Sequence, residues 1–296
     1  MILTAVSFVL LPKLPALHTW EVEAREERIA EEEFAQSQVT MQNLKIKEQN
    51  EAAGAKGELS IRLPEGVTGD QIAVSNDYVT QTIRVEIPQA DRTYFDSYPV
   101  LGNSDYIDGL SYTRQGETGV IEVTTNKVYE LQTEYDAQNF YFNFLTPHEV
   151  YDKVVVIDAG HGGRAVGANK QGINEKDIDL AIVLKLKEIF DNSDQNIGVY
   201  YTRTDDSNPT FDQRVQLANK SDADLFISIH NNSTRSGRMS GTSGTQVMYD
   251  ETSEASRQFA QICLEEVTGR IGSRDKGLVE GLSLIHISEP TRPERI

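Results

Sequence analysis

Hydrophobic and polar positions follow different patterns in the two halves of this chain. Over residues 58–150, apolar residues alternate with polar ones in short stretches separated by turn signals such as Pro64-Glu65-Gly66. This alternation is typical of half-buried strands. The predicted strands are Glu58–Leu63, Gln71–Ser75, Gln81–Ile87, Val120–Thr125, Tyr129–Glu134 and Phe140–Phe144. Short strands at this spacing predict a small all-β, sandwich-like module over residues 58–150.

Residues 151–281 show continuous apolar runs that alternate with helical patterns. Val154–Ile157 and Leu225–Ile229 are typical of central parallel strands covered on both faces. Asn174 is a suitable N-cap for a helix over residues 175–190. The remaining predicted strands and helices are Val199–Thr202, Phe211–Asn219, Thr245–Tyr249 and Ser253–Thr268. This order predicts an α/β domain with a mainly parallel sheet flanked by helices.

The N-terminal residues differ from both halves. The apolar run Ile2–Leu11 is too short to cross a bilayer as a helix but has the length of a signal-peptide apolar region. We therefore expect residues 1–20 to be the remnant of a truncated signal or membrane anchor, the alternative being a buried strand or helix of the domain. Residues 21–57 are rich in Glu, Ala, Gln and Lys, which predicts a solvated helix or a linker.

Residues 282–296 lack periodicity and turn signals. The segment Leu282–Arg292 resembles the translation of a transposon mosaic-end sequencing adapter. We therefore expect a non-native tail after Gly281, in which His286 has no function. The alternative is a genuine strand over Ser283–Ile287.

Charge and cysteine content exclude several classes of function. The chain of 296 residues has 28 basic and 46 acidic residues, a net charge of −18. Residues 58–150 hold 5 basic and 15 acidic side chains, or −10 of that total. Such a charge argues against nucleic-acid binding, which requires cations that neutralise phosphates. The single cysteine, Cys263, excludes an intramolecular disulfide and zinc sites built from several cysteines.

Two histidines directly follow predicted buried strands. His161 comes after Val154–Ile157, and His230 comes after Leu225–Ile229. Ligands of open α/β sheets bind at the carboxyl ends of the strands, so the two imidazoles converge if these strands are neighbours. Glu175, in the first turn of the next helix, brings a carboxylate to the same edge. Two histidines and a carboxylate form the ligand set of a catalytic zinc site. Taken singly, His161 fits a turn, His230 a hydrogen-bonded core position, and Glu175 a favourable helix-dipole position.

The segment 154–281 resembles the zinc-dependent N-acetylmuramoyl-L-alanine amidases, the family with an AmiC-like catalytic domain. The matching motifs, in order, are Ile157-Asp158-Ala159-Gly160-His161-Gly162-Gly163, Asn174-Glu175-Lys176-Asp177, Thr202-Arg203-Thr204-Asp205-Asp206, Arg214 with Ala218-Asn219, Leu225-Phe226-Ile227-Ser228-Ile229-His230-Asn231-Asn232 and Arg274-Asp275-Lys276-Gly277. The resemblance implies that His161, Glu175 and His230 bind zinc, and that zinc-activated water cleaves the amide between N-acetylmuramic acid and L-alanine in peptidoglycan. It also implies an exported protein of the bacterial cell envelope. The β module resembles, more weakly, the targeting modules that precede catalytic domains in cell-wall amidases.

The sequence departs from this family at its end. Family members have a later motif of the type Leu-Val-Glu-x-Gly-Phe, whose glutamate is catalytic, and we expect it beyond Gly281. Glu280 resembles that glutamate, but no Phe follows and it comes too soon after Lys276-Gly277. We therefore expect the chain as given to be inactive. The alternatives are another zinc carboxypeptidase or deacylase of the cell wall and a catalytically silent wall-binding scaffold.

Three further residues are candidates around the metal. Asp158 is a candidate partner for the second nitrogen of a ligand histidine, since such nitrogens usually donate to a carboxylate or carbonyl. Its alternative role is to stabilise the turn. Asn231 and Asn232 follow His230 and are candidates for hydrogen bonds to substrate, although both also suit a turn.

Overall fold

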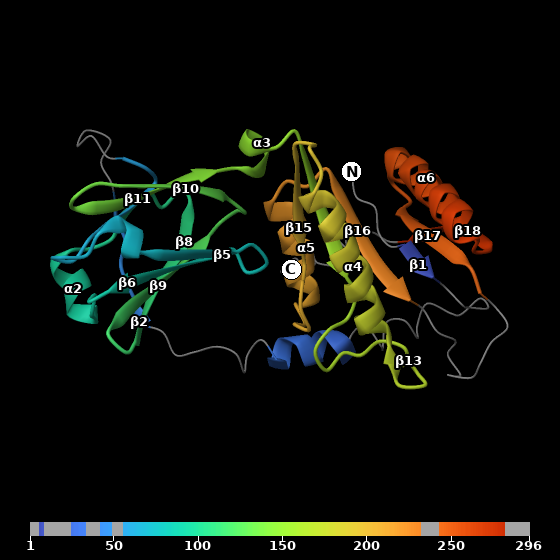
Figure 1. Cartoon of the computed structure of the whole chain (residues 1–296), viewed down its shortest axis with the longest axis horizontal. Helices are drawn as coiled ribbons and strands as arrows, with labels where there is room; N and C mark the ends of the chain where they lie inside the picture. The colour runs from blue at the N-terminus through green and yellow to red at the C-terminus, as the bar shows by residue number, and fades with distance from the viewer. Residues whose placement is uncertain (1–5, 9–24, 34–41, 49–55, 232–242, 282–296) are drawn as a thin grey trace, which may run out of the picture. The chain divides into compact units, whose positions relative to one another are not determined.

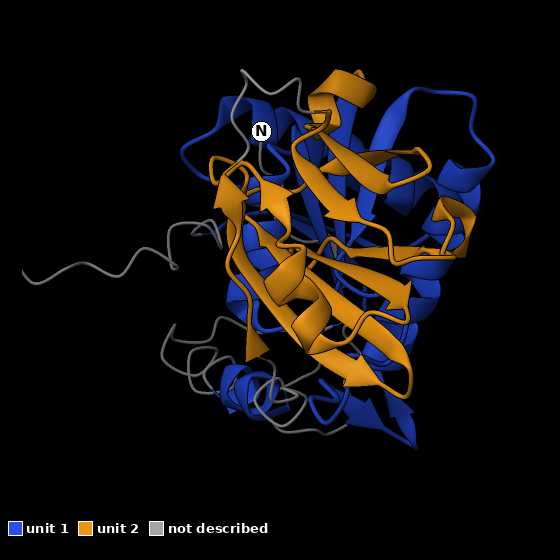
Figure 2. Cartoon of the chain, turned by 90° about the vertical axis from the view of Figure 1, so that its left-hand side faces the viewer, with its two compact units in different colours: residues 1–37, 153–296 blue, residues 38–152 orange. Residues whose placement is uncertain are grey.

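The computed structural model describes residues 6–8, 25–33, 42–48, 56–231 and 243–281. The chain forms two compact units, residues 1–37 with 153–296 and residues 38–152 (Figure 2). This division differs from the expected boundary at residue 58, because strands β2 (Gln42–Asn43) and β3 (Lys47–Glu48) pair within the second unit. The segment 21–57 is therefore shared between the units, and residues 25–33 are a helix of the first.

Residues 38–152 form two five-stranded sheets. One has the order β10-β11-β4-β7-β3 and the other β2-β8-β9-β6-β5. The remaining elements are β4 (Leu59–Arg62), β5 (Ala73–Asp77), β6 (Thr82–Pro88), α2 (Arg92–Ser97), β7 (Leu101–Gly102), β8 (Ile107–Gln115), β9 (Thr118–Thr125), β10 (Glu130–Tyr135), β11 (Asn139–Leu145) and α3 (Pro147–Val150), with a 3₁₀ turn at Gly69–Gln71. Apolar residues of both sheets share one core, in which Leu59, Val85 and Phe142 are fully buried. An all-β, sandwich-like unit is what the alternating pattern predicted.

The six strands predicted in this unit are present, with bounds shifted by one or two residues at most of their ends. Strand β6 shows the reason, because its side chains alternate between partly buried and buried positions along the whole strand. Strand β8 and helix α2 were not predicted. Glycine and polar residues interrupt the alternation in β8, and its long antiparallel pairing with β9 sets its conformation.

The first unit is built around a six-stranded sheet with the order β15-β12-β16-β1-β17-β18 (Figure 1). Its strands are β1 (Val6–Phe8), β12 (Lys153–Ala159), β15 (Ile197–Tyr201), β16 (Leu225–Asn231), β17 (Thr245–Asp250) and β18 (Asp275–Gly281). Besides the helix at residues 25–33, its helices are α4 (Glu175–Asp191), α5 (Phe211–Lys220) and α6 (Glu254–Ile271), and a small hairpin joins β13 (Asn169–Lys170) to β14 (Ile173–Asn174).

Helices cover both faces of this sheet. On one face, Val155 and Ile157 of β12 pack with Val183 of α4. Because side chains alternate along a strand, Asp158 points to the other face, where it contacts Arg214 of α5. Leu225 of β16 packs against the cluster that contains Val183 of α4 and against the cluster that contains Leu264 of α6, so α6 lies on the face that α4 covers. The predicted α/β architecture is thus present.

The strand directions are mixed. Strand β12 pairs in parallel with β15 and β16, β1 pairs in parallel with β16, and β17 pairs in parallel with β18. Strands β1 and β17 are antiparallel, so β17 and β18 run opposite to the other four. The expectation of a mainly parallel sheet therefore describes only part of the sheet, and β18 was not predicted.

The N-terminal apolar run contributes β1 to the middle of this sheet. This is the strand alternative of the sequence analysis for Val6–Phe8, while the rest of segment 1–20 lies outside the described residues. Within the described part of the chain, none of the helices combines the length and apolar character needed to cross a membrane.

Candidate metal centre

His161 and His230 lie at the same edge of the sheet. Strands β12 and β16 are parallel neighbours in which Ala159 is level with Ile229, so each strand delivers its histidine at its carboxyl end. The two rings meet edge to face, with centroids 4.7 Å apart. The convergence expected from the two strand ends is therefore present.

One potential metal-ligating atom from each of His161, Glu175 and His230 forms a nearly equilateral triangle, called the metal triangle below. Nε2 of His161 lies 3.1 Å from Nδ1 of His230 and 3.1 Å from Oε1 of Glu175, and the third side measures 3.3 Å. Ligands at 2.0–2.1 Å from a tetrahedral zinc ion are separated by about 3.3 Å. The three side chains therefore already have the spacing that one zinc ion requires.

Two backbone amides hold the carboxylate of Glu175 in this triangle. Glu175 begins helix α4 and is almost fully buried. Its Oε2 accepts a hydrogen bond from the amide of Ala168 at 2.8 Å, and its Oε1 accepts one from the amide of Asn231 at 2.7 Å. The orientation of the carboxylate is thus set by the chain on both sides of the site.

Asp179 adds a second buried carboxylate, one turn along α4. Each of His161, Glu175, Asp179 and His230 offers an atom within 4.8 Å of the others. Asp179 is fully buried, and within the described residues its Oδ2 has no hydrogen-bond partner. Burial raises the pKa of Asp179 to about 7. Two buried carboxylates and two imidazoles are a donor set that suits a divalent cation.

The charges of the triangle depend on one another. Burial opposes charge on His161, but hydrogen bonds to Glu175 and Glu26 raise its pKa to about 10. Burial also opposes charge on Glu175, yet contacts with His161 and His230 hold the pKa of Glu175 well below its usual range. In the absence of a cation, the site therefore holds a proton that a metal ion would displace.

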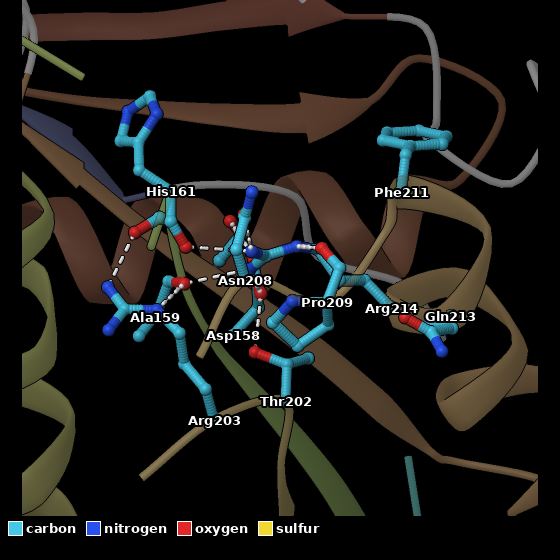
Figure 3. Close-up of polar contacts among 12 residues, drawn as sticks. Asp158, Ala159, His161, Thr202, Arg203, Asn208, Pro209, Phe211, Gln213 and Arg214 are labelled. Carbon is cyan, nitrogen blue, oxygen red and sulfur yellow. Dashed lines mark hydrogen bonds and ion pairs between the residues drawn. The ribbon is translucent and has the colours of Figure 1, made fainter. Parts of the chain in front are cut away.

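Two buried arginines support the turn that presents His161 (Figure 3). The guanidinium of Arg214 donates to the carbonyls of Ala159 and His161, each at 2.8 Å. Arg203 donates to the carbonyls of Ala159 and Gly160, at 2.9 and 2.7 Å. The backbone of His161 has a positive φ of 60°, a conformation that these contacts hold in place. In Figure 3 the His161 ring points away from both guanidinium groups.

Gly160 leaves room for the ring of His230. A Cβ atom at this position would lie 2.5 Å from Nδ1 and 2.7 Å from Nε2 of His230. The close approach of the β12 turn to the metal triangle therefore requires glycine here.

The other expected site residues have different positions. Asp158 accepts hydrogen bonds from Thr202 and Ser228, both at 2.6 Å, and from Arg214 at 2.5 Å. Asp158 thus holds Arg214, which binds the carbonyls of the turn. Among the described residues, its hydrogen bonds do not include one to an imidazole. The side-chain amide of Asn231 donates a hydrogen bond to Oδ1 of Asp179 at 2.7 Å. Asn232 lies outside the described residues.

Glu280 is remote from the triangle. Because β18 runs opposite to β12 and β16, its carboxyl end lies at the edge of the sheet opposite to His161 and His230. The Tyr249 hydroxyl donates to the Glu280 carboxylate at 3.0 Å. Glu280 is therefore not part of the metal triangle.

One contact of the site was not predicted. Oε2 of Glu26, in the helix at residues 25–33, lies 2.9 Å from Nδ1 of His161. The acidic composition of segment 21–57 suggested solvent exposure, and the two residues are 135 positions apart. A signal existed only in the spacing of Glu26, Ala30 and Glu33, which share one helix face.

Comparison with known proteins identifies the segment that holds this site. Residues 155–291 match a family model described as N-acetylmuramoyl-L-alanine amidase. This segment is therefore similar to the amidase family. It contains all three members of the metal triangle, as the motifs of the sequence analysis implied.

Several relatives share this segment. N-acetylmuramoyl-L-alanine amidase CwlM of Bacillus licheniformis is 33% identical over 123 residues, which are 42% of this chain and 47% of that protein. N-acetylmuramoyl-L-alanine amidase AmiC of Escherichia coli is 40% identical over 91 residues, 30% of this chain and 22% of that protein. The catalytic domain of CwlV, an amidase of Bacillus (Paenibacillus) polymyxa, is 36% identical with a TM-score of 0.40, covering 48% of this chain and 76% of that structure. The chain spans about half the length, or less, of these two curated relatives.

Proposed function

We propose that this protein is a zinc-dependent peptidoglycan hydrolase that cleaves the amide between N-acetylmuramic acid and L-alanine of the stem peptide. The observation that supports this most directly is the triangle of His161, Glu175 and His230, with sides of 3.1–3.3 Å, inside the segment that matches the amidase family. Neither feature alone is as specific, because the triangle fits several metallohydrolases and a family match alone says nothing of local geometry.

The chain's own residues would prepare the site before any substrate arrives. His161, Glu175 and His230 would hold the ion, which would polarise the scissile carbonyl and lower the pKa of a water molecule. The amides of Ala168 and Asn231 fix the carboxylate of Glu175, so it need not reorganise when the ion binds.

Hydrogen bonds also hold the turn that carries His161. Arg214 is paired with the buried Asp158 and also binds the carbonyl of His161. Burial opposes the charge of Asp158, but the Arg214 guanidinium keeps the pKa of Asp158 at about 2. The pair therefore stays charged at neutral pH.

Zinc binding tests the centre. We expect the wild-type chain to retain about one zinc ion after dialysis and the variants His161→Ala and His230→Ala to lose it. His148→Ala, in α3 of the other unit, is the matched control and should retain zinc. A wild-type protein without zinc, or equal zinc in all four proteins, would contradict the metal centre and favour a wall-binding scaffold.

Product analysis tests the reaction. Amidase action on purified peptidoglycan would release stem peptides with a free L-alanine amino terminus, whereas a carboxypeptidase would release D-alanine. Comparison with His230→Ala measures the activity of this chain that depends on the proposed metal centre. Turnover above that variant would show that its general base is present.

The substrate also defines the compartment. Peptidoglycan lies outside the cytoplasmic membrane, so we propose that the protein is exported to the bacterial cell envelope. Whether residues 1–20 anchor it there is testable by fractionating cells that express the chain with and without those residues.

A further inference from the structure

The helix at residues 25–33 is docked on the metal centre by its acidic side chains. The amide of Phe211, at the start of α5, donates to Oε2 of Glu27 at 2.5 Å. Both the amide and Nε of Arg164 donate to Oε1 of Glu33, at 3.0 and 2.9 Å. Ala30, between these contacts, is 2% exposed. The helix is therefore held at Glu27 and at Glu33 and packs against the amidase domain through one face.

Glu26 lies on this face and contacts a proposed zinc ligand. Its Oε2 is 2.9 Å from Nδ1 of His161, while Nε2 of the same ring is a corner of the metal triangle. Nδ1 of His161 is therefore directed to the helix, and Nε2 is directed to the proposed metal position. A carboxylate can only accept, so Nδ1 must hold the proton and Nε2 must present its lone pair when the ligand is neutral.

We propose that Glu26 is a positioning residue that fixes the tautomer and orientation of His161 for zinc binding. This inference rests on the proposed metal centre. It assigns a role to the N-terminal segment, outside residues 155–291 that match the amidase family. A hydrogen bond from the second nitrogen to a carboxylate raises the basicity of a ligand imidazole and restricts rotation of its ring.

The contacts of the neighbouring glutamates separate two roles of the helix. Glu27 and Glu33 attach the helix to the domain without touching the metal triangle, whereas Glu26 touches His161. Glu31 is exposed and belongs to the same helix. Replacing Glu31 removes the same charge as replacing Glu26, so it controls for electrostatic and helix-propensity effects.

The test measures zinc affinity by competition with a chelator in the full chain and in the variants Glu26→Ala, Glu26→Gln and Glu31→Ala. We expect Glu26→Ala to weaken zinc binding about 10- to 100-fold, the usual effect of removing such a partner. Glu26→Gln, whose amide oxygen still accepts a hydrogen bond, should retain part of the affinity. Glu31→Ala should match the wild type. Circular dichroism checks that the four proteins are folded alike.

A second readout reports on the hydrogen bond itself. In the zinc-loaded, ¹⁵N-labelled protein, the Nδ1 proton of His161 should be visible and protected from solvent exchange. In Glu26→Ala the same proton should exchange much faster. If Glu26 contributed to folding alone, Glu26→Ala would leave the exchange rate of this proton unchanged. The four folded proteins would then bind zinc with equal affinity.

The outcomes distinguish this inference from the function on which it rests. Failure of the wild-type chain to bind zinc would overturn the metal centre and this inference with it. Zinc binding that is equal in the wild type and Glu26→Ala would overturn the inference alone. Tighter zinc binding in Glu26→Ala than in the wild type would also overturn it and would instead assign the helix a covering role.

Discussion

Replacing Gly160 by alanine would place a methyl group against the ring of His230. The new Cβ atom would lie 2.5 Å from Nδ1, about 0.9 Å short of the 3.4 Å at which ordinary van der Waals contact begins. The carbonyls of Ala159 and Gly160 are bound by Arg203, so the turn is less free to move than the ring. His230 is 30% exposed and can rotate outward. We therefore expect the ring to move and the backbone to stay.

A movement of this size removes Nδ1 of His230 from the metal triangle. Metal–ligand distances tolerate only about 0.2 Å of deviation, and the ring must move several times as far. We expect Gly160→Ala to weaken zinc binding by about 100-fold or more, beyond the usual loss of an outer partner. The free energy of unfolding of the zinc-free protein should change by less than about 1 kcal/mol, because alanine also restricts the unfolded chain.

Chelator competition for zinc and urea unfolding of the zinc-free protein measure the two effects separately. Gly269→Ala is the matched control, since a Cβ atom there, within α6, meets no atom within 4 Å. It should leave zinc affinity unchanged. Wild-type zinc affinity in Gly160→Ala would refute the argument that His230 needs the space above Gly160.

Three other results are expected. Arg214→Gln leaves the carboxylate of Asp158 buried without its cation, so urea unfolding should show a loss of about 3–5 kcal/mol; a loss below 1 kcal/mol would contradict this. Burial opposes ionisation of Asp158, but Arg214 lowers its pKa from 3.8 to about 2, so this pair stabilises the fold by about 2 kcal/mol above pH 4. That stability should be lost as the pH falls through about 2, and Asp158→Asn should flatten this part of the stability–pH curve. Zinc at 100 times its dissociation constant should raise the free energy of unfolding by about 2.7 kcal/mol, an increase that EDTA should reverse and that a calorimetric melt would detect.

The elements of the amidase domain could be predicted because their patterns are local. The apolar runs of β12 and β16 and the N-cap and helical spacing of α4 each arise within a few residues. These elements alone place His161, Glu175 and His230 at strand and helix ends. Once the strands are parallel neighbours, the three side chains converge without further information.

Other features depended on contacts between distant segments. The antiparallel pairing of β1 with β17 has no local signal, because the register of a short apolar strand is set by its neighbours. The sequence left Asp158 two roles, as partner of an imidazole or as support of the turn, and the alternation of β12 turns its side chain toward α5 and Arg214, which binds the turn. Asn231 likewise binds Asp179, a residue 52 positions away.

The sequence by itself determined the fold class of both units and the strand and helix ends at which His161, Glu175 and His230 lie, because hydrophobic periodicity and strand ends are encoded locally. Only the tertiary structure decided which partner each donor has. It brought Glu26 to Nδ1 of His161, placed the amide of Asn231 on Glu175, and put Glu280 at the opposite edge of the sheet. A hydrogen bond requires its two atoms within about 3 Å. Residue pattern does not fix such a distance across more than a hundred positions, whereas packing of the helix at residues 25–33 against the domain does.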